Sequence, residues 1–273
     1  FEKKEAPGGV VRHVIPEFRI ASEDVMKDIA FIERLGVHIK VNSPVHSIDE
    51  LKEKGFKKII VAIGASKEGI LSLKSGSAIS AVTFLEDFKS TEGNMDIGSQ
   101  VVVVGGGNTA MDTARAAIRV DGVEKVTLIY RRTKRYMPAD EEELLLAIEE
   151  GVEFMELLTP VSFENRTLTC HRIKLGEPDA SGRRSPVETE EVIEILADVV
   201  IGAVGEHIDD GFYKSNSIMM TYGGNPAVDA ETLQSSVSGV YIIGDGRGGP
   251  ASVVEAIADA TKVSEAILSE RMA

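Results

Sequence analysis

A glycine-rich run near residue 105 has the composition and spacing of a dinucleotide-binding loop. Four consecutive valines precede the sequence Gly105-Gly106-Gly107-Asn108-Thr109-Ala110. In this G-x-G-x-x-A pattern the first glycine allows a tight turn, the second lets the backbone approach a pyrophosphate, and the alanine allows close helix–strand packing. The unpaired N–H groups of the following helix would hold the anion. We therefore expect the pyrophosphate to be bound by Gly105, Gly106, Gly107, Asn108 and Thr109.

A basic run at the end of the next expected strand distinguishes between the two nicotinamide coenzymes. The chain reads Tyr130-Arg131-Arg132-Thr133-Lys134-Arg135 at this point. An NAD site places a carboxylate here for the ribose 2′-hydroxyl, whereas guanidinium groups bind a 2′-phosphate through charge-assisted, often bidentate hydrogen bonds. We therefore expect a Rossmann-type site from Gln100 to Arg132 that prefers NADPH to NADH, with Arg131, Arg132 and Arg135 on the coenzyme. The alternatives are a glycine-rich turn without a ligand and a solvated basic turn, and the strand–loop–helix context disfavours both.

A second candidate site follows a short apolar strand near the C-terminus. The sequence Val240-Tyr241-Ile242-Ile243 ends in Gly244-Asp245, where a carboxylate at the strand end can bond a ligand hydroxyl. A helix expected to begin around Ala251-Ser252-Val253 would give a second terminus that favours anions. Gly-Asp alone is a common turn, so this site depends on its context.

Apolar periodicity predicts alternating strands and helices along the chain. Helices are expected at residues 22–35, 48–54, 83–88, 108–120, 138–150 and 251–268. Strands are expected at residues 37–41, 58–63, 100–104, 125–130, 152–157, 163–174, 187–196, 198–203 and 240–243. This alternation predicts parallel sheets with right-handed crossovers, and residues 66–98 otherwise have the composition of a linker. Because the pattern restarts near residue 99 and changes again near residue 206, we expect an inserted domain whose flanks pack together.

The composition excludes several classes of function. A formal net charge of −14 over 273 residues repels phosphate backbones and anionic lipid, which argues against a nucleic-acid or membrane partner. Cys170 is the single cysteine, so the chain can form neither an internal disulfide nor a dithiol redox pair, and it cannot ligate an iron–sulfur cluster alone. This cysteine usage favours a reducing, cytoplasmic compartment.

The remaining polar residues are expected to be structural. The five histidines show no metal-binding spacing, so no metal site is expected. The acidic run Asp140-Glu141-Glu142-Glu143 would complement the dipole at the start of a helix. Asp112 and Arg115 lie one helical turn apart and either pair with each other or form a solvated face. No arrangement suits acid–base or nucleophilic catalysis, so no catalytic residue is expected.

Several motifs occur in a fixed order along the chain. They are Pro7-Gly8-Gly9, Ile15-Pro16-Glu17-Phe18-Arg19, the GGGNTAMD run, Tyr130-Arg131-Arg132 with Met137-Pro138-Ala139, and Gly244-Asp245 with the GPASVVEAI run. This set resembles the glutamate-synthase small-subunit family of FAD/NADPH oxidoreductases, and the likeness covers nearly the whole chain. A narrower resemblance, to selenate reductase iron–sulfur flavoprotein subunits, rests on Leu175-Gly176-Glu177-Pro178-Asp179, Gly182-Arg183-Arg184 and Pro186-Val187-Glu188-Thr189.

The resemblance implies a role for each matching residue. Glu2 would hold the adenosine ribose of FAD, and Gly8 and Gly9 would form a loop beside the flavin. Gly64 would lie in a strand-end motif in which Ile63 replaces the threonine of the family. Asp245, after Gly244, would bond the ribityl chain. The residues that would face the flavin ring are Ser252 and Val253, and Gly205 would approach the nicotinamide.

The same resemblance implies an α/β fold with an insertion. A Rossmann-like NADPH-binding domain, residues 99–205, would be inserted into an FAD-binding domain formed by residues 1–98 and 206–273. In the family an FAD fingerprint precedes the acid that corresponds to Glu2, and a cysteine-rich iron–sulfur region lies further upstream. Because the chain begins at Phe1 without either, we expect a fragment with a partial, N-terminally truncated FAD-binding domain.

Two functions are compatible with these features. The first is an oxidoreductase that passes electrons from NADPH through FAD to iron–sulfur centres on the full-length protein or on a partner. The second is a module that binds NADPH without turnover because its FAD site is incomplete. A flavin-dependent disulfide reductase is a third possibility, which the single cysteine excludes.

Overall fold

The computed structural model describes residues 1–178 and 182–270. The chain divides into two compact units. The first unit contains Phe1–Pro7, Leu35–Glu68 and Glu206–Ala273, and the second contains Gly8–Arg34 and Gly69–Gly205. Asp179, part of the narrower family motif, lies outside the described residues.

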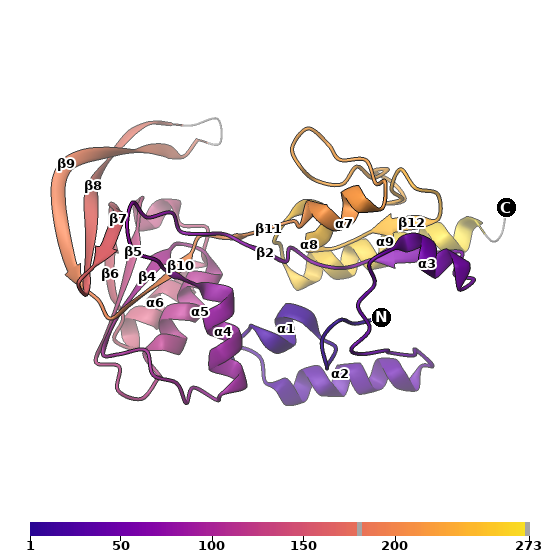
Figure 1. The fold of residues 1–273 in the computed structure, drawn as a ribbon, viewed down its shortest axis with the longest axis horizontal. Helices are drawn as coiled ribbons and strands as arrows, with labels where there is room; N and C mark the ends of the chain where they lie inside the picture. The colour runs from indigo at the N-terminus through magenta and orange to yellow at the C-terminus, as the bar shows by residue number, and fades with distance from the viewer. Residues whose placement is uncertain (179–181, 271–273) are drawn as a thin grey trace. The chain divides into compact units, whose positions relative to one another are not determined.

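The second unit is built on a five-stranded parallel sheet in the order β3-β10-β4-β5-β6 (Figure 1). Its strands are β3 (Ile79–Ser80), β4 (Gln100–Gly105), β5 (Lys125–Tyr130), β6 (Glu153–Glu156) and β10 (Val199–Ala203). The four valines of β4 are all buried, as expected for a parallel strand that is covered on both faces. In the register of β4 with β10, Gly105 lies opposite Ala203, so the sheet ends beside the glycine loop.

Helices cover one face of this sheet and a second sheet covers the other (Figure 1). The helices are α4 (Ala81–Ser90), α5 (Asn108–Ala117) and α6 (Glu141–Glu149), and the second sheet is β7 (Leu158–Glu164), β8 (Thr167–Pro178) and β9 (Arg184–Leu196). On the helical face, Val101 and Val103 pack with Met111 and Leu144. On the opposite face, Val102 and Val104 pack with Leu168 and Cys170. The alternation of β4 side chains therefore joins three layers into one core.

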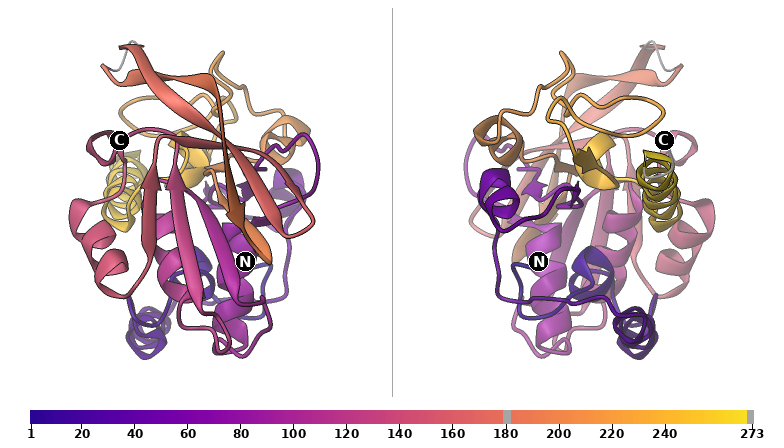
Figure 2. Two further views of the ribbon diagram at one scale, coloured as in Figure 1. Left: turned by 90° about the vertical axis from the view of Figure 1, so that its left-hand side faces the viewer. Right: turned by 90° about the vertical axis from the view of Figure 1, so that its right-hand side faces the viewer.

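The strands β8 and β9 form a long antiparallel hairpin, which is labelled in Figure 1 and faces the viewer in the left view of Figure 2. The same unit also contains α1 (Gly9–His13), α2 (Ser22–Arg34) and the 3₁₀ turn η1 (Lys134–Tyr136). Helix α2 begins at Ser22, whose N–H and hydroxyl both donate to the carboxylate of Glu17.

The first unit has a small parallel sheet in which β1 (Ile59–Val61) pairs with β12 (Val240–Ile242). Its other elements are α3 (Ile48–Glu53), α7 (Asp210–Ser215), α8 (Asp245–Gly248), α9 (Val253–Glu270), β2 (Lys67–Glu68) and β11 (Glu206–His207). The buried face of the sheet packs against α3 and against Tyr213 of α7. Strands β2 and β11 pair with each other in antiparallel orientation.

The first expected domain boundary differs from the division seen in the structure. Residues 66–98 do not behave as a linker, because β3 joins the five-stranded sheet beside β10 and α4 packs against α5. Residues 8–34 also belong to the second unit. Short strands such as β3 carry too little periodicity to be recognised in the sequence.

Two expected elements were wrong in detail. Residues 37–41 form no strand, although Lys40 accepts a hydrogen bond from the N–H of Glu2. Helix α6 begins at Glu141 rather than at Pro138. The N–H of Ala139 donates to the carbonyl of Gly106 rather than within the helix, and Asp140, the N-cap residue, has an extended backbone conformation. Helices α1, α7 and α8 and strand β7 were not predicted, and all three helices are at most six residues long.

Candidate functional site

The three glycines of the nucleotide loop have different surroundings. A Cβ atom on Gly105 would lie 2.3 Å from the carbonyl oxygen of Ala203, and one on Gly106 would lie 2.4 Å from the ring of Tyr130. A Cβ on Gly107 would meet nothing within 4 Å. Gly105 and Gly106 are therefore required by packing, whereas Gly107 leaves open space in front of the first turn of α5.

The start of α5 presents backbone N–H groups beside this space. Gly107 is the N-cap residue and has extended backbone angles. Because glycine has no side chain, it supplies no capping oxygen. Asn108 and Thr109 are the first two residues of the helix, whose N–H groups have no intrahelical acceptor. This arrangement fits a pyrophosphate, which would supply the acceptor oxygens.

Hydrogen bonds between Asn108 and Asp140, which the sequence did not predict, hold the loop in place. The N–H of Asp140 donates to Asn108 Oδ1 at 3.1 Å, and Asn108 Nδ2 lies 3.5 Å from the Asp140 carboxylate. Together with the bond from Ala139 to Gly106, these contacts fasten the segment before α6 to the loop. The partners are 32 residues apart, so no local pattern connects them.

The two arginines expected at the 2′-phosphate differ in exposure. Arg131 is exposed, whereas Arg132 is only 8% exposed and its Nε donates to the carbonyl of Arg184 at 3.0 Å. Arg135 is exposed and its guanidinium lies 6.0 Å from the ring centre of Tyr136. All three lie on the turn after β5, and Arg132 is fixed there by the first residue of β9.

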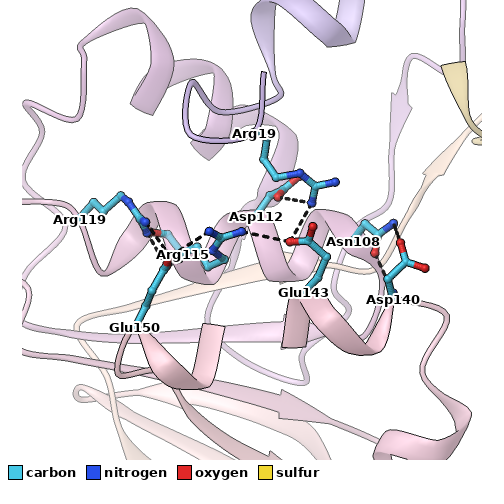
Figure 3. A network of polar contacts seen from close by, with 8 residues as sticks. All are labelled: Arg19, Asn108, Asp112, Arg115, Arg119, Asp140, Glu143 and Glu150. Carbon is cyan, nitrogen blue, oxygen red and sulfur yellow. Dashed lines mark hydrogen bonds and ion pairs between the residues drawn. The ribbon is translucent and has the colours of Figure 1, made fainter. Parts of the chain in front are cut away.

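A network of ion pairs lies along α5 and α6 (Figure 3). Arg19 Nη1 lies 2.9 Å from Asp112 and 3.1 Å from Glu143, and Glu143 also accepts from Arg115 at 3.1 Å. Glu150 accepts from both Arg115 and Arg119. The expectation that Asp112 and Arg115 pair with each other or face solvent was wrong, because both are buried and each has another partner.

The carboxylates of this network have opposite pKa shifts. Burial raises the pKa of Asp112 to about 6, against the opposing effect of Arg19. Hydrogen bonds from Arg119 and Arg115 lower the pKa of Glu150 to about 2. Phe18 lies against the same arginines, with its ring centre 4.7 Å from the Arg115 guanidinium and 4.3 Å from that of Arg119. The network therefore anchors the Phe18–Arg19 segment on the helix that begins at the nucleotide loop.

Gly205 lies at the end of the segment that leaves β10. It has a φ of +98°, and a Cβ there would meet nothing within 4 Å. Its carbonyl accepts from the N–H of Gly69 at 2.8 Å, and a Cβ on Gly69 would lie 2.3 Å from that oxygen. The open space at Gly205 is compatible with the close approach expected for a nicotinamide.

The expected flavin residues near the C-terminus lie together at the end of β12. Gly244 has a φ of +61° and precedes α8, which begins at Asp245. The carboxylate of Asp245 accepts from the N–H of Ala251 at 3.0 Å, and burial raises its pKa. Ser252 and Val253 are exposed at the start of α9.

Ser252 also forms a reciprocal cap at this helix start. Its N–H donates to the Glu255 carboxylate at 2.9 Å, and its hydroxyl accepts from the N–H of Glu255 at 3.2 Å. This S-x-x-E capping box was visible in the sequence and was not predicted.

Tyr213 and Gly64 complete the surroundings of α8. The Tyr213 hydroxyl donates to the carbonyl of Gly246 at 2.8 Å, and burial raises the pKa of Tyr213 to about 12. Gly64 has a φ of +72°, and its backbone N and O would each lie 3.4 Å from a Cβ on Gly246. Close backbone packing therefore joins the end of β1 to the turn that carries Asp245.

The N-terminal flavin residues are divided between the two units. Glu2 belongs to the first unit, where its carboxylate accepts from the N–H of Lys4 at 2.8 Å. Gly8 and Gly9 belong to the second unit, where Gly8 caps α1 and Gly9 is its first residue. Gly8 lies in the loop before the helix, as expected, whereas Gly9 begins the helical turn that the bond from the Arg12 N–H to the Gly8 carbonyl closes.

Within the described residues, no group of three His, Cys, Asp or Glu side chains is placed to hold a metal ion. None of the helices in the described ranges is both long and apolar enough to cross a bilayer.

Comparison with known proteins identifies the family. Residues 13–260 match the sequence model of the pyridine nucleotide-disulphide oxidoreductases. YgfK of Escherichia coli (strain K12) is 40% identical over 273 residues, which cover 98% of this chain and 26% of YgfK. The glutamate synthase [NADPH] small chain of Azospirillum brasilense is 31% identical over 293 residues, which cover 98% of this chain and 60% of that protein. The chain thus spans about a quarter of the first relative and less than two thirds of the second.

A solved structure shows the same fold. FprA of Mycobacterium tuberculosis in complex with NADPH superimposes with a TM-score of 0.78 at 18% identity, covering 97% of this chain and 76% of FprA. The α/β fold and the resemblance to the glutamate synthase small chain are confirmed by these matches. The chain belongs to the pyridine nucleotide-disulphide oxidoreductase family, a family of oxidoreductases that bind FAD and nicotinamide coenzymes such as NADP(H).

Proposed function

We propose that this chain is the coenzyme-binding part of a reductase that takes hydride from NADPH and delivers electrons, through FAD, to iron–sulfur centres. Those centres would lie elsewhere in the full-length protein or on a partner subunit. The observation that carries the proposal is the open space at Gly107, in front of the N–H groups of α5 and followed by the basic turn after β5. The cofactors supply hydride transfer and onward electron release, and the protein supplies position and electrostatics.

The residues of the second unit would bind the coenzyme in three places. The loop from Gly105 to Thr109 would hold the pyrophosphate, and the basic turn would hold the 2′-phosphate. Gly205 would leave room for the nicotinamide. Because Arg132 is fixed through its Nε, its orientation is set before the coenzyme arrives, whereas Arg131 is exposed to it.

The residues at the end of β12 would bind the flavin. Asp245 would accept from a ribityl hydroxyl, and the start of α9 at Ser252 and Val253 would face the ring. Glu2 would hold the adenosine ribose, and Gly64, Gly8 and Gly9 would line the cofactor. Apolar side chains on β1 and α9, such as Ile60 and Val254, are exposed, so we propose that this sheet and helix pack against further polypeptide of the same protein.

A dithiol mechanism is not part of the proposal. Cys170 is fully buried on β8, and burial raises the pKa of its thiol to about 12, so little thiolate forms near neutral pH. We place the protein in the cytoplasm on its cysteine usage alone.

The test is a comparison of NADPH and NADH binding. We expect NADPH to bind markedly tighter than NADH, and the double variant Arg131→Ala/Arg132→Ala to lose this preference while NADH affinity stays within about twofold. Charge-assisted hydrogen bonds contribute about 1.5–3 kcal/mol each, so the loss for NADPH should exceed tenfold. Equal affinity for both coenzymes in the unmodified protein would contradict the proposal.

Flavin absorbance distinguishes the enzyme from the alternative of a binding module. Purified full-length protein that carries oxidised flavin and is bleached by NADPH supports the reductase. Protein that binds NADPH but neither retains nor accepts FAD supports a module without turnover.

A further inference from the structure

An ion pair in the first unit joins the turn after β12 to the body of α9. Arg247 lies on α8, and Asp259 lies on α9, near a cavity of about 330 Å³ that both residues line with Gly244 and Glu255. Neither Arg247 nor Asp259 belongs to the motifs that carry the family resemblance. Their contacts lie directly beside the residues proposed to bind the flavin.

Asp259 accepts three hydrogen bonds although it is only 8% exposed. Arg247 Nε lies 2.8 Å from Oδ2 and Arg247 Nη2 lies 3.1 Å from Oδ1, which makes the pair bidentate. The N–H of Gly244 donates to Oδ2 at 3.0 Å. A buried carboxylate is stable only when such donors satisfy it, so the three contacts act as one unit.

These contacts hold both ends of the turn that carries Asp245. Gly244 lies before Asp245 and Arg247 lies two residues after it, and the N–H of Arg247 also closes the turn onto the carbonyl of Gly244 at 2.9 Å. Gly244 has a φ of +61° and a ψ of −152°, a conformation that glycine adopts without strain and that other residues rarely adopt. Because both flanks are tied to one carboxylate on α9, the distance between Asp245 and the helix start is fixed.

We propose that Arg247 and Asp259 are positioning residues for the flavin, which set Asp245 against the first turn of α9. This inference rests on the flavin site proposed above. Neither side chain needs to touch the cofactor. The pair instead determines whether the Asp245 carboxylate and the N–H groups at the start of α9 meet the cofactor together.

The first experiment measures FAD affinity of the flavin-stripped, full-length protein by quenching of flavin fluorescence. The variants are Asp259→Ala, Arg247→Ala and the double variant. Asp210→Asn is the matched control, since it removes an exposed ion pair with Lys214 in the same unit. We expect each single variant to weaken FAD binding at least tenfold and the control to bind as the unmodified protein does.

The double variant separates positioning by the pair from two independent effects. If the pair acts as one unit, the FAD affinity of the double variant equals that of the single variant with the lower affinity. The second substitution then removes no further interaction. Losses that multiply in the double variant, or unchanged affinity in both single variants, would overturn the proposal.

The second experiment is hydrogen exchange in the absence of flavin, which does not depend on the cofactor. The N–H of Ala251 donates to the Asp245 carboxylate, so its exchange rate reports where that carboxylate lies. The N–H of Ile242 donates to Leu233 within the same unit and reports general stability. We expect Asp259→Ala to accelerate exchange at Gly244 and Ala251 and to leave Ile242 unchanged.

The two experiments fail in different ways. Equal acceleration at Ile242 would show a merely structural role and would overturn the inference. If the unmodified protein does not bind FAD, the proposed flavin site is wrong, and the exchange at Ala251 still decides whether the pair positions Asp245.

Discussion

Asp112 is a carboxylate that is buried on the nucleotide-loop helix, paired with Arg19, and still easier to protonate than in water. Burial raises its pKa from 3.8 to about 6, because the cost of removing the charge from water exceeds the attraction of Arg19 and Arg115. Glu143, a second carboxylate bonded to the same arginine, adds to the increase. Glu150, at the other end of the network, is held ionised by two arginines.

The opposite shifts predict stability changes in separate pH windows. The folded protein binds a proton at Asp112 more tightly than the unfolded chain, so this contribution is full below pH 4 and is lost as pH rises from about 4 to about 6. The free energy of unfolding of Asp112→Asn, relative to the unmodified protein, should therefore rise across this window by roughly 2 kcal/mol. Urea unfolding at a series of pH values measures this difference, and parallel profiles would contradict it.

The pKa of Glu150 is shifted in the opposite direction from that of Asp112. Its folded pKa of about 2 lies below the ordinary value, so its stabilisation is present above about pH 4.5 and is lost as pH falls toward 2. The difference in the free energy of unfolding between Glu150→Gln and the unmodified protein should therefore become smaller as the solution is acidified. A profile with the same window as Asp112→Asn would show that the network titrates as one group.

At the scale of elements, neighbouring glycines of the nucleotide loop have different roles, one in packing and the other in the proposed coenzyme binding. Gly106 and Gly107 are adjacent, yet only Gly106 faces the buried ring of Tyr130, whose hydroxyl is itself bonded to the carbonyl of Tyr136. Gly107 has a φ of −97°, which any residue adopts, and open space around its Cα.

Substitution of these two glycines should have opposite consequences. Gly107→Ala should leave thermal stability unchanged but weaken NADPH binding at least tenfold, because the methyl group occupies the space proposed for the pyrophosphate. Gly106→Ala should lower stability by about 1–3 kcal/mol, as overpacking against an immobile ring does. Calorimetry and coenzyme titration of the pair distinguish the two effects, and an unchanged affinity of Gly107→Ala would count against the proposed site.

The start of α9 is stabilised by a capping box. Ser252 and Glu255 cap each other reciprocally, and loss of an N-cap hydroxyl costs about 1 kcal/mol. Ser252→Ala should therefore lower the free energy of unfolding by about that amount, whereas Ser264→Ala, farther along the same helix, should have a smaller effect. Thermal or urea unfolding of both variants measures the difference.

The sequence predicted the long, periodic elements and the glycine loop, whose signals are local. It placed β4, α5, β5 and their glycines nearly where they lie, because strong apolar runs and a glycine-rich turn are local features of the sequence. It could not place the start of α6, since the bonds from Ala139 and Asp140 reach back to residues more than thirty positions away. The partners of Asp112 and Asp259 were hidden for the same reason. The roles assigned to Arg131, Asp245 and the other cofactor residues stay predictions.

At the scale of the whole molecule, the candidate coenzyme and flavin residues belong mainly to different units. The nucleotide loop and the basic turn lie in the second unit, whereas Gly244, Asp245 and the start of α9 lie in the first. A ligand that binds only the folded state stabilises the part to which it binds.

The two cofactors should therefore protect different segments from hydrogen exchange. NADPH should slow exchange in residues 105–112 and at the turn after β5, and FAD should slow exchange in residues 244–256. NADH at the same concentration is the control for the first effect and ADP-ribose for the second. Protection of residues 244–256 by NADPH in flavin-free protein would contradict this assignment.

The close packing of Tyr130 against Gly106 has a further, spectroscopic consequence. The chain contains five tyrosines and no tryptophan, so its ultraviolet emission comes from tyrosine alone. Tyrosine emission overlaps the absorption of reduced nicotinamide, and Tyr130 lies in direct contact with the loop proposed to hold that coenzyme. This chain thus contains its own energy-transfer donor beside the candidate site, so we expect coenzyme binding to this chain to quench its tyrosine emission without an introduced label.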